Sequence, residues 1–294
     1  MDAFRPIYLQ NYALKIITKT LTTRLQLKIP KLIDIHQTGF VKGRAISATF
    51  VYALELVQTC HKRKRPAIVL KLDFAKAFDT VNWIGLKSVL QARGFDQRWI
   101  GWMHYLLSSS KSTVLVNGCL GAWISCKRGL RQGDLLSPYL FILVEETLQH
   151  LITNVVEIRH PTDENLPCAV LQYAYDTLIV FKAETIAALK LKEVLDQFAA
   201  MSGLHINFGK STLVPIHADD QVVHQCVQIL GCSEGSFPHQ YLGLPLSANK
   251  LLVLAFNICI QKIDKFLGSW QTDLLHPMGR IVLVNSVLDS ILVH

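Results

Sequence analysis

The chain has 294 residues, of which 50% are hydrophobic and only 18% are charged, and its formal net charge is +8. This composition excludes a chain that is disordered over most of its length, and it supplies enough apolar side chains for a sizeable core in one large domain or two modest ones. The excess of cations favours a polyanionic partner. Seven cysteines without a CxxC pair argue against a zinc site or a disulfide framework and fit an intracellular protein.

Targeting signals do not stand out in the sequence. No apolar run approaches the roughly 18–20 residues that cross a bilayer. The N-terminal MDAFRPIYLQ lacks the pattern of a signal peptide. We therefore expect no membrane segment.

Helical and extended patterns alternate in the first third of the chain. A helix is expected after Pro6, which suits a first helical turn, and a second from Ser47 to the basic cluster HKRKR at 61–65. That cluster is either a solvated helix end or a direct phosphate contact. AIVLKLDF, residues 67–74, alternates between two faces and predicts a strand with Asp73 at its end.

The middle of the chain predicts helices on either side of two short strands. Helices are expected at about 80–93, where Asp79 would cap the N-terminus, and at about 96–109. Two short strands flank a turn near Gly118–Gly121, and a strongly apolar helix opens at Ser137–Pro138.

A β-hairpin is predicted beyond that helix, over residues 168–183, with its turn at Tyr175–Asp176. A helix at about 184–201, a strand at 204–208 and further helices complete the pattern. Because strands and helices are intermixed, the predicted fold class is α/β (α+β), with helices packed on a sheet.

Asp73 and Asp176 are the carboxylates that this arrangement places at a strand end and a hairpin turn. Enzymes that join nucleotides use a pair of divalent ions about 3.5–4 Å apart, which stabilise the attacking and leaving oxygens. Magnesium prefers hard oxygen ligands, so at least two carboxylates from separate strands must converge. These two acidic residues are far apart in the sequence and meet that need only if the fold brings them together.

Eight segments in a fixed order resemble the reverse transcriptase of non-LTR, LINE-type retrotransposons, most closely those of plants, and they cover essentially the whole chain. An opening segment, FRPIYLQNYALKIITKTLTTRL, and a fingertip loop, QTGFVKGR (37–44), precede motif A, KLDFAKAFDTVNW within 67–83. GLRQGDLLSPYLF resembles motif B (129–141), and LQYAYDTLIVF resembles motif C (171–181). GLHINFGKS and YLGLPL resemble motifs D and E, and GSWQTDLLHPMGRIVLVNSVL resembles the entry to the thumb.

This resemblance implies a right-hand polymerase fold with fingers, palm and thumb. Fingers and palm would occupy residues 1–260, with a small antiparallel palm sheet packed on helices, and residues 261–294 would begin a truncated thumb. The implied activity is RNA-directed DNA polymerisation with two Mg²⁺ ions. Its partners would be an RNA template, a DNA primer and deoxynucleoside triphosphates, and the family role would place the protein in the nucleus. The oligomeric state stays open.

The resemblance also implies roles for individual residues in the palm. Asp73, Asp176 and the carbonyl of Phe74 would bind metal. Lys210 would act as a general acid near the leaving pyrophosphate. Phe78 would lie beneath the sugar, where its ring would exclude a ribose 2′-hydroxyl.

The fingertip loop and motif B would contact the nucleotide. Lys42 and Arg44 would bind the triphosphate, and Gln132 and Gly133 would line the nucleotide pocket. Leu242–Gly243 would support the end of the primer. Three structural alternatives stay open beside these roles: a core phenylalanine, an ordinary basic loop and a surface lysine.

Motif C departs from the family's Tyr-Ala-Asp-Asp, because Tyr175 replaces the first aspartate, which is expected to bind metal together with Asp73. A phenol is uncharged at neutral pH and is a poor magnesium ligand. Asp176 is one residue further along, so strand alternation would turn it to the opposite face. Motif B also carries Leu135 where proline is usual. We therefore expect an impaired or inactive polymerase.

Two further hypotheses remain. One is a non-catalytic retroelement remnant that at most binds nucleic acid through its basic surface. The other is an RNA-dependent RNA polymerase or an intron-encoded maturase. Phe78 argues against the RNA polymerase, which must admit a 2′-hydroxyl, and the sequence outside the palm argues against the maturase.

Overall fold

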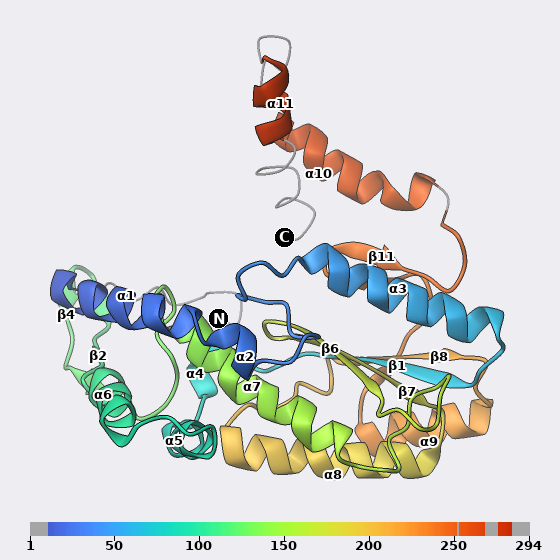
Figure 1. Ribbon diagram of the computed structural model, residues 1–294, viewed down its shortest axis with the longest axis horizontal. Helices are drawn as coiled ribbons and strands as arrows, with labels where there is room; N and C mark the ends of the chain where they lie inside the picture. Colours follow the sequence, from blue (N-terminus) through green and yellow to red (C-terminus); the bar gives the residue numbers. More distant parts are fainter. Residues whose placement is uncertain (1–10, 252, 268–275, 284–294) are drawn as a thin grey trace.

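A computed structural model describes residues 11–251, 253–267 and 276–283, which Figure 1 draws in colour. Its centre is a five-stranded sheet in the order β6-β7-β1-β8-β9. The strands are β1 (Ala67–Leu72), β6 (Ala169–Tyr173), β7 (Asp176–Lys182), β8 (Thr212–Ile216) and β9 (Ser233–Glu234). Neighbouring strands are antiparallel except for the short β8–β9 pair. The small antiparallel sheet that the sequence predicts is therefore present.

β1 lies in the middle of this sheet because its side chains are apolar on both faces. Ile68, Leu70 and Leu72 belong to one buried cluster, and Ala67 and Val69 belong to a second cluster on the other side. A strand that is buried on both faces needs a covering layer on each side. The alternation that predicted the strand therefore also specifies a three-layer arrangement.

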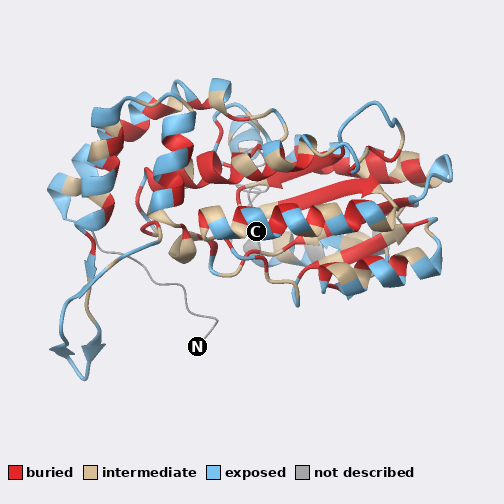
Figure 2. Cartoon of the chain, turned by 90° about the horizontal axis from the view of Figure 1, so that it is seen from below, coloured by how far each residue is buried: buried red, intermediate tan, exposed pale blue. Residues whose placement is uncertain are grey.

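Helices form those two layers (Figure 1). α7 (Ser137–Thr153), α8 (Thr185–Ser202) and α9 (Asp220–Leu230) pack on one side, which we call the α7 face. The opposite side, the α3 face, is covered by α3 (Ile46–Lys62) and by the hairpin of β10 (His239–Tyr241) and β11 (Leu244–Leu246). In Figure 2 the sheet and the helix sides that meet it are buried, whereas the outer helix sides are exposed.

The remaining elements extend beyond the sheet. They are α1 (Tyr12–Gln26), α2 (Ile29–Leu32), α4 (Ala77–Thr80), α5 (Trp83–Ala92), α6 (Gln97–Ser108), η1 (Val253–Phe256), α10 (Asn257–Leu267) and α11 (Pro277–Leu283). Four two-residue strands build an exposed arm that projects from the body (Figure 2). In it β2 (Lys111–Ser112) pairs with β5 (Ile124–Ser125), and β3 (Leu115–Val116) pairs with β4 (Cys119–Leu120). None of the helices in the described ranges is long and apolar enough to span a membrane.

Two predictions about strands are wrong. The hairpin turn lies at Ala174–Tyr175 rather than at Tyr175–Asp176, because Tyr173 pairs directly with Asp176. The expected strand at 204–208 is reduced to a single bridge between Phe74 and Ile206. The chain turns immediately afterwards, since the N–H groups of residues 210 and 211 both donate to the carbonyl of residue 207.

The helix cap predicted at Asp79 is also wrong. Asp79 lies inside α4, a separate helical turn, and Asn82 caps α5 by accepting a hydrogen bond from the Ile84 N–H at 2.8 Å. The first helix begins at Tyr12 with Asn11 as its cap, and the predicted start near Pro6 lies outside the described residues. The predicted thumb segment, 261–294, is described only at 261–267 and 276–283.

Candidate active site

Asp73 follows the end of β1, and its backbone is fixed by a neighbouring loop. The Asp73 N–H donates to Ser211 Oγ at 3.1 Å, and its carbonyl accepts from the Asn207 N–H at 2.7 Å. The adjacent Phe74–Ile206 bridge uses the hydrogen bonds of residues 73 and 75, so the Phe74 carbonyl points away from residue 206. The segment that resembles motif D thus holds both sides of the Asp73 backbone.

Asp176 lies opposite Asp73 on the same face of the sheet. Leu72 pairs with Thr177, so the next position on each strand brings Asp73 across from Asp176. Cross-strand neighbours share a face, and here it is the α3 face, because Val69 and its partner Val180 belong to that cluster. The expectation that Asp176 faces away from Asp73 is wrong, because the register of β1 with β7 places Asp176 across from Asp73, whereas Tyr175 packs on the α7 face.

The electrostatics of the site reflect this proximity. Burial raises the pKa of the Asp176 carboxyl, the nearby Lys71 ammonium opposes that shift, and the negative charge of Asp73 adds to it. The Lys71 Nζ also donates to the carbonyl of Gln240 at 3.1 Å. Lys71 was not predicted as a site residue, although it lies two positions before Asp73 on the same face of β1.

Tyr175 occupies the turn where the family's first aspartate is expected. Its side chain is half-buried and packs against the α7-face cluster, whereas Tyr173 packs against the α3-face cluster. Within the described residues no group of three or more His, Cys, Asp or Glu side chains is placed to hold a metal ion. The site therefore offers two carboxylates, Asp73 and Asp176, and one nearby carbonyl.

Motif A and motif B are joined through their backbones. The Leu130 N–H donates to the carbonyl of Phe78 at 2.6 Å, and the half-buried Phe78 ring stacks on Phe141 with centroids 4.9 Å apart. Gln132 Nε2 donates weakly to Asp79 Oδ1 at 3.4 Å. Gly133 follows with a φ of +89° and open space on the side where a Cβ would lie. Phe78, Gln132 and Gly133 are thus contributed by two adjoining segments.

The three predicted cations differ in their surroundings. Lys42 and Lys210 are exposed. Arg44 instead turns its guanidinium into its own loop, where it donates to the carbonyls of Ile33 at 3.0 Å and Gln37 at 2.6 Å and also to that of Asp34. In this conformation the Arg44 guanidinium stabilises the fingertip loop. Its donors are used by backbone carbonyls and are not directed at a phosphate.

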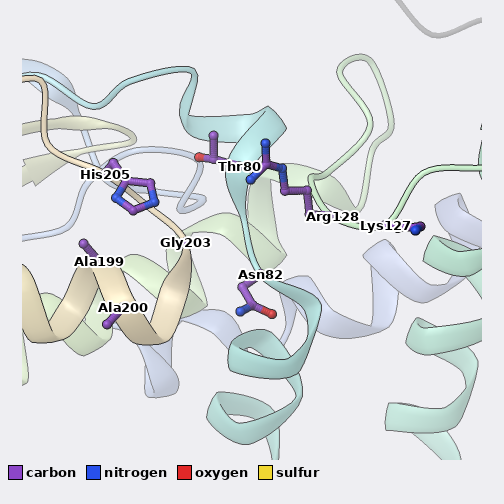
Figure 3. A pocket seen from close by; sticks show the side chains of 8 residues that line it. All are labelled: Thr80, Asn82, Lys127, Arg128, Ala199, Ala200, Gly203 and His205. Atoms are coloured by element: carbon purple, nitrogen blue, oxygen red, sulfur yellow. The ribbon is translucent and has the colours of Figure 1, made fainter.

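A pocket of about 330 Å³ is lined by residues from the end of α4, the end of α8 and the segment that precedes motif B (Figure 3). None of its lining side chains is a carboxylate, and none of the predicted site residues lines it. Figure 3 labels the polar side chains of its lining, among them His205, Thr80 and Arg128. The lining residues are Thr80, Asn82, Lys127, Arg128, Ala199, Ala200, Gly203 and His205.

Comparisons with known proteins identify the family of this chain. Residues 1–246 match the family described as reverse transcriptase (RNA-dependent DNA polymerase). A 149 kDa protein of transposon TX1 from Xenopus laevis is 26% identical over 98% of this chain and 22% of its own length. A Pol polyprotein from the type-1 retrotransposable element R2 of Popillia japonica is 28% identical over 74% of this chain and 30% of its own length. The chain thus spans less than a third of each relative.

Solved structures show the same fold at low sequence identity. Telomerase from Candida tropicalis, in complex with a TWJ fragment of telomeric RNA, superposes with a TM-score of 0.52 at 12% identity. That match covers 89% of this chain and 43% of the telomerase chain. The structural likeness establishes the polymerase fold, and the match over residues 1–246 establishes the lineage. The chain belongs to the reverse transcriptase (RNA-dependent DNA polymerase) family, in its non-LTR retrotransposon branch.

Proposed function

We propose that this chain is the RNA-directed DNA polymerase domain of a LINE-type retroelement and that this copy is a poor or inactive polymerase. The observation that carries the proposal is the position of Asp73, just after β1, across from Asp176 at the start of β7, beside a turn that holds Tyr175 instead of a carboxylate. Reverse transcriptases as a family use divalent metal ions.

The residues present fit one divalent ion better than two. Asp73, Asp176 and the Phe74 carbonyl supply hard oxygen ligands of the kind Mg²⁺ prefers, and the mutual repulsion of the two carboxylates would be relieved by a bound cation. A bound ion would stabilise charge on the attacking and leaving oxygens. Tyr175 adds no carboxylate for a second ion. We therefore expect weak binding of the second of the two Mg²⁺ ions.

The side chains around this site would bind the nucleotide. Phe78 would lie beneath the sugar of a deoxynucleoside triphosphate, supported by its stacking on Phe141. The exposed Lys42 would contact the triphosphate, and Gln132 and Gly133 would line the pocket. Lys210 would donate a proton to the leaving pyrophosphate.

Primer extension on an RNA template with a DNA primer, deoxynucleoside triphosphates and Mg²⁺ tests the proposal. The unchanged chain should be close to background, and Tyr175→Asp should raise extension by about a hundredfold or more, since loss of one anion-stabilising group costs about 10²–10³ in rate. Tyr105→Asp is a matched control, because Tyr105 is 74% exposed on α6. Robust synthesis by the unchanged chain would overturn the proposed impairment.

A second candidate function is nucleic-acid binding without catalysis. Lys62, Arg63, Lys64 and Arg65 are exposed at the end of α3, and none of the four forms an ion pair with the described residues. If this cluster binds phosphates, affinity for RNA should fall steeply with salt, and the four alanine substitutions should reduce the slope of log K against log salt. An unchanged slope would leave the cluster a solvated helix end.

A retroelement polymerase acts on genomic DNA, so we also propose a nuclear location, which imaging of a tagged chain tests.

A further inference from the structure

Glu145, in the middle of α7, is a completely buried carboxyl that joins two distant segments. It is 0% exposed, as are its neighbours Gln37 and Thr177. Gln37 Nε2, from the fingertip loop, donates to Glu145 Oε2 at 2.8 Å. Thr177 Oγ1, the second residue of β7, donates to Glu145 Oε1 at 3.0 Å. One side chain of α7, four residues beyond motif B, thus connects the fingertip loop with motif C.

Gln37 in turn binds the backbone of the motif C turn. Its Oε1 accepts from the Ala174 N–H at 3.2 Å and from the Gly39 N–H at 2.8 Å. Its Nε2 also lies 3.4 Å from the Ala174 carbonyl. Both polar backbone groups of Ala174 therefore face one glutamine side chain.

The backbone of the fingertip loop lies directly against the same hairpin. The Thr38 N–H donates to the carbonyl of Gln172 at 3.0 Å, and the Gln172 N–H donates to the carbonyl of His36 at 3.0 Å. Gly39 approaches so closely that a Cβ there would lie 2.2 Å from the Ala174 nitrogen. The backbone of the loop at residue 39 therefore packs directly against the backbone of the turn at residue 174.

Ala174 needs such support, because it has a φ of +52°. A residue with a Cβ adopts this conformation rarely, and it persists where the surroundings over-determine it. The conformation of Ala174 fixes where Tyr175 and Asp176 lie. Gln37, held by Glu145, is therefore in a position to fix the strand end that carries Asp176.

Burial disfavours the charged form of the Glu145 carboxyl in this network. Burial raises its pKa well above the usual range; Thr177 and Gln37 oppose that shift by hydrogen bonding, and Asp176 and Glu146 add to it through their charges. A neutral glutamine of the same shape can accept from Gln37 and donate to Thr177. An apolar methionine can do neither, so both buried partners lose their hydrogen bond to residue 145.

We propose that Glu145 is a positioning residue that couples the fingertip loop to motif C, so that docking of the loop and placement of Asp176 opposite Asp73 occur together. This inference rests on the proposed function of Asp73 and Asp176 as metal ligands. Its specific consequence is that a substitution that loosens the fingertip loop also loosens motif C, and a substitution that loosens motif C also loosens the loop. Order in residues 37–39 and divalent-ion affinity at the palm should therefore change together.

Amide hydrogen exchange on the full chain tests the coupling without any need for activity. Glu145→Met and Thr177→Val should each speed exchange at residues 37–39 and 174 by about tenfold or more relative to amides of α8, since each removes a hydrogen bond from a buried partner. Glu145→Gln should leave these amides close to the unchanged protein. Thr22→Val is the matched control, because Thr22 is a buried threonine whose hydroxyl donates to the carbonyl of Thr18 in its own helix.

Mn²⁺ titration of the same variants supplies the second measurement. Glu145→Met should weaken Mn²⁺ binding several-fold, Glu145→Gln should restore it, and Asp73→Asn should abolish it. If the unchanged chain binds no Mn²⁺ at Asp73, the proposed metal site fails while exchange still decides the coupling. Exchange that rises only beside the substituted residue, rises uniformly over the chain, or rises equally in Thr22→Val would overturn the coupling.

Discussion

Replacing Glu146 by glutamine should stabilise the protein at neutral pH and remove a defined part of its pH dependence. Glu146 is 1% exposed in α7, and its Oε1 accepts from the Asp34 N–H at 3.0 Å. Its Oε2 is buried without a hydrogen-bond partner among the described residues. His150 lies 3.7 Å away but is 60% exposed, so solvent screens its charge. The carboxylate form is therefore poorly compensated in the folded protein.

The size of the effect follows from the pKa of this group. Burial raises the pKa of Glu146 from 4.5 to about 7, against the opposing Asp34 hydrogen bond and the charge of Arg93. Between these two values the folded state binds more protons than the unfolded state, so stability falls as pH rises through this window. At about 1.4 kcal/mol per pH unit, the loss approaches about 3 kcal/mol by neutral pH.

Urea unfolding of the protein and of Glu146→Gln between pH 4.5 and 8 measures this difference. The free energy of unfolding of Glu146→Gln, relative to that of the unchanged protein, should rise with pH up to about pH 7 and then level off. A contribution of the amide that does not depend on pH does not affect this slope. Glu164→Gln is a control of opposite sign, because the Lys182 hydrogen bond lowers the pKa of the exposed Glu164. Its loss of stability should shrink as pH falls. A difference for Glu146→Gln that does not vary with pH would refute the reasoning.

Two further predictions concern the fingertip loop. Gly39→Ala should destabilise the protein by more than about 2 kcal/mol in urea unfolding, because the new Cβ would lie 2.2 Å from the Ala174 nitrogen. Gly101→Ala, in α6 with nothing within 4 Å of the new Cβ, should instead stabilise it by up to about 1 kcal/mol; equal effects at the two glycines would contradict the close approach. Arg44→Lys should cost about 1–3 kcal/mol and speed proteolysis of the loop, since a single ammonium cannot replace the guanidinium donors. Lys42→Arg should have neither effect, and a loss as large as that of Arg44→Lys would contradict the different roles of the two cations.

Local patterns in the sequence predicted β1, β6 and β7 of the sheet and the main helices that cover it, but β8 and β9 were not predicted. The alternation through Ile68, Leu70 and Leu72 predicted the central strand, and the apolar run after Ser137–Pro138 predicted α7. The hairpin turn was misplaced by one residue because Tyr-Ala-Tyr-Asp contains no strong turn signal. The positive φ of Ala174 accompanies contacts from Gln37, which no local pattern contains.

The candidate site was predicted only in part, because some of its contacts join segments that are far apart in the sequence. Asp73 and Asp176 were identified by motif, and the structure brings them together, whereas the predicted facing of Asp176 was wrong because it depended on the register of β1 with β7, which no local pattern contains. Glu145 was missed, since it lies 108 positions from Gln37 and is one of two adjacent glutamates in a helix that was predicted from its apolar residues. A buried acid on the face of a core helix was the available signal, because such a residue requires partners. Arg44 was predicted from its charge, but its hydrogen bonds go to carbonyls of its own loop.

The number of Mn²⁺ ions bound at the palm tests the central claim most directly. Electron paramagnetic resonance would count them on the full chain with an RNA template, a dideoxy-terminated primer and a deoxynucleoside triphosphate. The account predicts one ion for the unchanged chain, two for Tyr175→Asp and none for Asp73→Asn. Two ions bound by the unchanged chain, or binding that survives Asp73→Asn, would contradict the assignment of Asp73 and Asp176 as a metal site that lacks its third carboxylate.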